Sequence, residues 1–400
     1  MKAVRTEQIY IEENDTLSNM CHISKNLYNQ VNYILKNQFV NKEKMSGYSA
    51  LVKLFQEPTT VDEHNNYQKL PTQTAQWTIK KAKQDWNSHF KLIKAWKKQP
   101  DNFSGKPRPP QYKNRNGEFM LIFTNQQCKI DNGVLKFPKI MEMEVKTGLE
   151  NVDLREVRIL PSGVGYMIEI VYQKDVVDRT AKFERVIGID IVVRAGLLKS
   201  KNQFYNKELA GLRSINDIQK NVKQTKRMQQ LSIIRNGKVK DIMHRVSKSI
   251  VDYAIDRSID TIVIKHNNGW KQSINNEKIN NQNFVQLPFD MLIQQIKYKA
   301  EEKGINVVIQ EESHTSKCSF LDNESVEHHD TYIGKRISRG VFLSANSTRI
   351  NAYLNASYNI IKKTLPEEFA DGIEGVGLHP TKFKHQADDN FQRRMLTWLT

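Results

Sequence analysis

The sequence predicts a multidomain α+β protein in which a helical segment interrupts an antiparallel β region and an α/β region follows. Three observations support this order. Apolar residues recur every three or four positions after Pro71, their period falls to two within residues 119–174, and short apolar strands alternate with helices after Arg179. A chain of 400 residues exceeds a single hydrophobic core, so two to four domains are expected.

The helical segment is predicted to span residues 16–98, after a strand-like run at 9–12 and with a polar loop near 57–70. Pro71 is typical of a helix start, and the apolar stripe that follows consists of Ala75, Ile79, Ala82, Trp86, Phe90 and Ile93. Seven lysines fall mainly on the rest of this helix, with Asp85 as the only acid. A solvated face would explain such a run, but its charge favours a face that lies against phosphates.

An extended arm, GKPRPPQYKNR at residues 105–115, separates this helix from the β region. Its prolines and glycine exclude a helix, and four basic side chains project from it. Residues 119–174 then read as short strands, with Asn132-Gly133 as a tight-turn signal. The sequence predicts a small antiparallel β-barrel here.

The α/β region contains three strand-like runs, at residues 185–192, 261–265 and 306–310. An amphipathic helix at 240–257 and a helix opened by Pro288 lie between them. Such alternation predicts a sheet covered by helices on its faces, and acidic site residues are expected where the strands end.

The most specific motif lies at residues 350–360, which read INAYLNASYNI. This stretch closely resembles the C-terminal end of the RuvC-like nuclease in TnpB proteins, the transposon-encoded RNA-guided relatives of type V CRISPR effectors. There the segment reads INADVNGAYNI and its Asp binds metal, whereas this chain has Tyr353. A phenol stays protonated near neutral pH and cannot replace a carboxylate in holding hard divalent cations.

The resemblance also places the other positions of the nuclease site. The first metal-binding Asp of the family corresponds to Asp190, although an Asp after an apolar strand can also cap the next turn. Many relatives end the next strand with IVIED, where this chain has IVIKH and thus Lys265. A subgroup draws its acid from an EES segment, here Glu311 and Glu312. With Tyr353, these residues predict a degenerate site that has no catalytic residues and requires no metal.

The resemblance implies a domain order as well. The expected domains are a β-barrel wedge domain (1–15 and 112–180), a helical recognition domain (16–111), a RuvC-like domain of the RNase H type (181–310 and 341–370), a degenerate target-nucleic-acid-binding insertion (311–340) and a C-terminal tail (371–400). The three cysteines are isolated, with no CxxC pair, so the zinc knuckle of many relatives is not expected. The alternative is a mixed site of Cys318 with His314, His328 and His329.

Charge and resemblance together indicate guide RNA and double-stranded DNA as partners. The net charge of +17 and the pI of about 9.5 fit a chain that lies along phosphate backbones, although a basic protein need not bind them. The predicted backbone contacts are Lys80, Lys81, Lys94, Lys97, Lys98, Lys106, Arg108, Lys113 and Arg115. The residues matching those that contact a short flanking motif in relatives are Tyr48, Gln73, Thr74, Gln76 and Trp77; solvation or packing would also explain them.

The sequence therefore predicts a catalytically inactive RNA-guided DNA-binding protein that represses transcription by occupying a guide-matched promoter site. One alternative is an active RNA-guided DNA endonuclease of a transposon, in which Glu311, Glu312 or another acid compensates for Tyr353. Another is a transposon accessory protein that binds RNA but does not open DNA. No apolar run approaches the length of a membrane span, so a cytoplasmic location, nucleoid-associated when DNA-bound, is expected.

Overall fold

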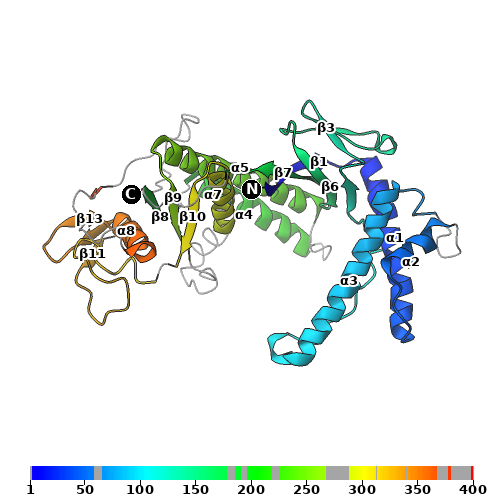
Figure 1. The fold of residues 1–400 in the computed structure, drawn as a ribbon, viewed down its shortest axis with the longest axis horizontal. Coiled ribbons are helices and arrows are strands. Elements are labelled where there is room, and N and C mark those ends of the chain that lie inside the picture. The colour runs from blue at the N-terminus through cyan, green and yellow to red at the C-terminus, as the bar shows by residue number, and fades with distance from the viewer. Residues whose placement is uncertain are drawn as a thin grey trace. The chain divides into compact units, whose positions relative to one another are not determined.

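The computed structural model divides the chain into two compact units, Lys2–Asp175 and Val176–Thr400, which are described separately (Figure 1). The structure describes residues 2–57, 65–177, 185–190, 196–218, 225–266, 288–311, 313–338, 340–366, 377–379 and 398–399. No helix among these residues is long and apolar enough to cross a membrane.

Two antiparallel sheets form the β part of the first unit. The larger has the order β1 (Lys2–Glu12), β7 (Gly165–Asp175), β6 (Asp153–Pro161) and β2 (Leu121–Thr124). The smaller consists of β3 (Lys129–Asp131), β4 (Val134–Lys136) and β5 (Glu144–Lys146). A tight turn joins β3 to β4, with φ of 48° at Asn132 and 71° at Gly133, as predicted.

The predicted β-barrel is not closed in the described part of the chain. Strands β3 to β5 are three residues long and pair with one another, so they do not extend the four-stranded sheet. Strands β1 and β2 are the edges of that sheet. The pattern of alternating residues identified the strands, but it could not decide which of them pair.

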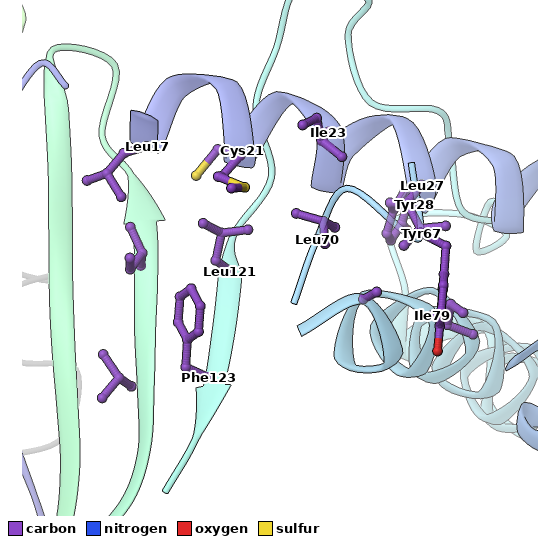
Figure 2. Close-up of a cluster of buried hydrophobic side chains, with 14 of the residues drawn as sticks. Leu17, Cys21, Ile23, Leu27, Tyr28, Tyr67, Leu70, Ile79, Leu121 and Phe123 are labelled. Atoms are coloured by element: carbon purple, nitrogen blue, oxygen red, sulfur yellow. The ribbon is translucent and has the colours of Figure 1, made fainter. Parts of the chain in front are cut away.

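Three helices accompany these sheets: α1 (Asp15–Val40), α2 (Tyr48–Gln56) and α3 (Thr72–Lys98). Helix α1 begins where the Asn14 side chain accepts the Leu17 amide at 2.9 Å. The predicted stripe on α3 faces inward, since Ala75, Ile79, Ala82 and Trp86 are buried. Helices and sheet share one core, in which Leu17 and Cys21 of α1 lie beside Leu121 and Phe123 of β2 (Figure 2). Short 3-10 turns lie at Pro100–Asn102 and Lys139–Met141.

The second unit contains a sheet of order β10-β9-β8-β14. Strands β8 (Val186–Asp190), β9 (Thr261–Lys265) and β10 (Asn306–Gln310) are parallel, and β14 (Trp398–Leu399) pairs antiparallel with β8. The helices are α4 (Gly196–Ile218), α5 (Lys226–Asp256), α7 (Phe289–Glu302) and α8 (Ala352–Thr364). This is the predicted α/β arrangement (Figure 1).

The sheet carries helices on both faces. Ile187 and Ile189 of β8 join the core formed with α5 and α7. Helix α8 lies on the opposite face, where it approaches β8 at Gly188 (Figure 1). Beyond β10, a three-stranded sheet of β11 (Lys335–Ser338), β12 (Val341–Leu343) and β13 (Arg349–Asn351) leads directly into α8.

Candidate functional site

The carboxyl ends of three parallel strands bring predicted site positions to one edge of the sheet. Ile189 pairs with Ile264, and Asp190 and Lys265 are the next residues of β8 and β9. Lys265 in turn pairs with Gln310, which Glu311 follows. Because neighbouring strands lie about 4.8 Å apart, these backbone positions adjoin one another. The side chain of Asp190, and all of Glu312, lie outside the described part of the structure.

Gly188 sets the distance between this sheet and helix α8. A Cβ atom built on Gly188 would lie 2.8 Å from the carbonyl oxygen of Ser357 and 3.2 Å from a side-chain carbon of Ile361. Only glycine therefore lets the helix backbone come this close to β8. Tyr353 lies one helical turn before Ser357, so this contact also fixes the height of Tyr353 above the sheet.

Tyr353 occupies the first turn of α8 in a cationic setting. Asn351 caps the helix by accepting the Tyr353 amide at 2.9 Å. The Arg336 guanidinium lies 5.3 Å from the centroid of the Tyr353 ring. A phenol lacks the anionic oxygen that holds a hard divalent cation, and the Arg336 charge beside the ring repels such a cation.

Glu311 forms an ion pair with the C-terminal end of α8, away from Tyr353. Its carboxylate accepts the Lys363 ammonium at 2.8 Å and the Ser313 amide at 3.1 Å. The hydrogen bond from Lys363, with help from Ser313, lowers the pKa of Glu311 to about 2. Lys363 follows Tyr353 by ten positions, or about 15 Å along the helix. The structure therefore does not bring Glu311 and Tyr353 together.

The described residues do not supply the donors of a two-metal centre. Such a centre uses several carboxylates around a pair of ions about 4 Å apart. The described groups at the strand ends include the Lys265 ammonium, a Glu311 carboxylate paired with Lys363, and His266, whose Nε2 lies 3.3 Å from the Asp290 carboxylate. No group of three or more His, Cys, Asp or Glu residues suited to a metal is found in the described ranges.

Protein hydrogen bonds hold the segment between β10 and β11, which includes Cys318. Glu324 is 4% exposed, and its carboxylate accepts the amides of Ser319 at 2.6 Å and Ile333 at 3.0 Å. It thereby joins two distant parts of the segment, which is the task a bound zinc ion performs in a knuckle. Cys318 is buried, and its Sγ donates to the Glu327 carbonyl at 3.5 Å.

Helix α8 anchors the same segment through polar side chains. The buried Asn355 accepts the Phe320 amide at 2.9 Å and donates to the Cys318 carbonyl at 2.9 Å. Asn359 donates to the carbonyls of Thr315 at 2.9 Å and Cys318 at 2.8 Å. Asn355 and Asn359, two of the three asparagines of the INAYLNASYNI motif, thus have a structural task, which the sequence had not indicated.

In the first unit, the structure brings several of the predicted flanking-motif residues together. Gln76 donates to the Tyr67 hydroxyl at 3.4 Å. Burial, with a smaller contribution from Tyr67, raises the pKa of Tyr48. The Lys80 ammonium lies 4.0 Å from the Trp77 ring. Tyr67 was not singled out from the sequence, because it lies in a polar loop without periodicity.

Two of the predicted flanking-motif residues, Gln73 and Thr74, already make contacts within the protein. Gln73 donates to Gln126 at 2.6 Å and accepts the Thr124 hydroxyl, so it ties α3 to β2 and the turn after it. Thr74 is fully buried and does not reach the surface. The surface part of the cluster therefore consists of Tyr48, Gln76 and Trp77, which we call the amide-aromatic patch.

The predicted backbone contacts differ in exposure. The exposed ones are Lys80, Lys94, Lys97, Lys98, Lys106, Arg108 and Arg115, while Lys81 is partly covered. Lys113 is half-buried, with its ammonium 4.6 Å from the Tyr28 ring and 4.9 Å from the Phe119 ring. Lys113 thus packs against aromatic faces, and less of it is open to a partner than the sequence predicted.

A ladder of polar side chains on α1 fixes the arm at residues 105–115. Lys25 donates to the Arg115 carbonyl at 2.6 Å, and burial lowers the pKa of Lys25. Asn29 donates to the Lys113 carbonyl at 3.0 Å and accepts its amide at 2.8 Å. Asn32 donates to the Pro110 carbonyl at 3.4 Å. These polar residues recur at helical spacing on the buried side of α1, a pattern that could have indicated the contact.

Comparison with known proteins shows what this chain is similar to. Residues 289–360 match the Cas12f1-like TNB domain family. The chain is 23% identical to the TnpB-like protein ORF457 of Acidianus two-tailed virus over 405 aligned residues, which cover 87% of this chain and 83% of that protein. This is a multidomain α/β protein, and the predicted resemblance to TnpB-like proteins is confirmed.

Two solved structures are also similar. One is the cryo-EM structure of a Cas12f1-sgRNA-target DNA complex, with 13% identity, a TM-score of 0.47 and coverage of 88% of this chain and 83% of that chain. The other is the cryo-EM structure of a CRISPR-Cas12f ternary complex, with 12% identity, a TM-score of 0.30 and coverage of 86% and 80%.

Proposed function

We propose that this chain is a catalytically inactive RNA-guided DNA-binding protein that represses transcription by occupying a guide-matched promoter site. The observation that carries the proposal is Tyr353, which stands in the first turn of α8 beside Arg336, where TnpB-like nucleases have a metal-binding Asp. Lys265 at the end of β9 and the pairing of Glu311 with Lys363 support it. Guide RNA and duplex DNA are the partners, and no metal takes part.

The two units divide this task. We assign the first unit to the wedge, which is an open sheet here, and to the helical recognition domain, with their boundary near residues 111–112. In the second unit we assign residues 181–310 and 341–370 to the RuvC-like domain and 311–340 to the target-nucleic-acid-binding insertion; 371–400 form the tail. In this assignment the RuvC-like sheet serves as a binding scaffold.

Binding would then proceed without bond cleavage. Base pairing with the guide supplies sequence specificity, while the protein reads a short flanking motif and the shape of the duplex. The exposed basic side chains of α3 and the arm neutralise phosphates, which gives affinity for any sequence. The amide-aromatic patch is suited to the flanking motif, because amides can pair with base edges.

A reporter assay tests this proposal. Cells express the chain, a guide and a reporter whose promoter matches the guide. Replacing Lys80, Lys94, Lys97 and Lys98 together by glutamine should relieve repression, and the matched Lys→Arg variant, which retains the charge, should repress like the wild type. Asp190→Ala should leave repression nearly intact, because no metal chemistry is used. Loss of repression in a folded, RNA-bound Asp190→Ala variant would contradict the binding-only mechanism.

A further inference from the structure

A pocket of about 400 Å³ lies in the first unit between α1, α3 and the arm. Its volume falls in the range of about 300–1,000 Å³ that is usual for sites of small ligands. The side chains that give it chemical character are Asp85, Ser88, His89, Arg108, Tyr112 and Lys113. None of the predictions from the sequence required these residues to converge.

Positive charge lines the arm side of the pocket. Arg108 is exposed, and Lys113 is held with its ammonium 4.6 Å from the Tyr28 ring. Lys36 reaches the same region, with its ammonium 4.8 Å from the Tyr112 ring. An anion is therefore favoured here, and a guanidinium can bind a phosphate through two hydrogen bonds.

Tyr112 offers an aromatic surface beside this charge. Its side chain is 44% exposed although it belongs to a pocket wall, and the arm that carries it is fixed to α1 at Lys113 and Pro110. An exposed ring held on a rigid support is suited to stacking against a nucleobase. Such stacking contributes about 1–3 kcal/mol per base.

The α3 side of the pocket is polar, and a hydrogen bond from α1 holds one of its side chains in place. Tyr28 donates to Asp85 at 2.6 Å, which fixes the carboxylate. His89 is 5% exposed, and its Nδ1 has no hydrogen-bond partner in the described part of the chain. Burial lowers the pKa of His89, so the ring stays neutral near pH 7. Asp85 and Ser88 can accept hydrogen bonds from a ribose hydroxyl or a base amino group.

We infer that this pocket binds one unpaired RNA nucleotide, with its base on Tyr112, its phosphate on Arg108 and Lys113, and its ribose hydroxyl toward Asp85. The inference rests on the RNA partner of the proposed function and adds a discrete site to a surface that otherwise binds phosphates without preference. The 2′-hydroxyl distinguishes RNA from DNA at such a site.

The test uses the full chain, freed of bound nucleic acid in high salt, and a fluorescent five-nucleotide oligoadenylate as RNA and as DNA. Tyr112→Ala should weaken RNA binding about tenfold, as expected for one lost stacking contact. Tyr112→Phe should bind like the wild type, which separates stacking from folding. Lys98→Gln serves as a control that removes a charge outside the pocket, and it should reduce affinity less than Arg108→Gln.

Two results would overturn the inference: equal affinity of the wild type and Tyr112→Ala for the RNA probe, or equal affinity of the wild type for the RNA and DNA probes. The RNA that co-purifies with the wild type is measured in parallel. Guided repression without a Tyr112 effect would refute the pocket alone. A Tyr112 effect without any co-purified guide would refute the proposed function and leave the pocket.

Discussion

Replacing Glu324 by alanine should locally unfold the segment between β10 and β11 while the sheets keep their structure. The buried carboxylate accepts two backbone amides, those of Ser319 and Ile333. Without it, the buried Ser319 amide has no acceptor, whereas Ile333 is an exposed residue whose amide can bond to water. An unsatisfied buried group costs about 1–3 kcal/mol, so a local loss of about 1–3 kcal/mol is expected.

Amide hydrogen exchange measures this loss directly. A loss of 1.4 kcal/mol corresponds to a tenfold change, so the protection factor of the Ser319 amide should fall at least about fivefold. Glu327→Gln is the matched control, because this exposed carboxylate accepts only the Ser325 hydroxyl among the hydrogen bonds described for its side chain. Unchanged protection in Glu324→Ala would refute the argument that this carboxylate holds the segment together.

Three further predictions follow from contacts in the two units. Gly188→Ala should destabilise the second unit by about 1–3 kcal/mol in urea unfolding, because its Cβ would meet a helix carbonyl, whereas Gly237→Ala, with open space around it, should be neutral or stabilising. The low pKa of Glu311 contributes stability that is present above pH 4.5 and lost as the pH falls toward 2; Lys363→Gln should raise that pKa toward 4.5 in an NMR titration, and no change would contradict the ion pair. Gln76→Ala should weaken DNA binding by about 1–3 kcal/mol at the preferred flanking motif and far less at scrambled flanks; equal loss at both would exclude base reading.

The sequence alone predicted the helices, strands and turns that local residue patterns define. The stripe on α3, the turn at Asn132-Gly133 and the α/β alternation of the second unit are local patterns, and the structure contains each of them. It was insufficient for sheet closure, because strand pairing depends on contacts between residues far apart in the chain. Helix α5 also begins at Lys226, well before residue 240, since Thr225 caps it.

For the site, the motif located Tyr353 and the apolar runs located the strand ends, but neither gave the distances between side chains. Only the structure shows that Glu311 pairs with Lys363, because that contact joins residues 52 positions apart. Likewise, nothing in the sequence distinguishes Gly188 from any other small residue in an apolar strand. Only the structure shows that the Ser357 carbonyl lies against it. The sequence analysis predicted that Thr74 contacts the flanking motif at the surface, but Thr74 lies on the buried side of α3.

The most direct test of the central claim is a single incubation of the guide-loaded protein with a matched supercoiled plasmid in Mg²⁺. Footprinting reports occupancy of the target, and gel mobility reports nicks and breaks in the same sample. We predict a protected target and an intact plasmid, because the proposed function rests on a phenol at position 353, which cannot hold a divalent cation as a carboxylate does. Guide-dependent cleavage at the protected site would contradict the account.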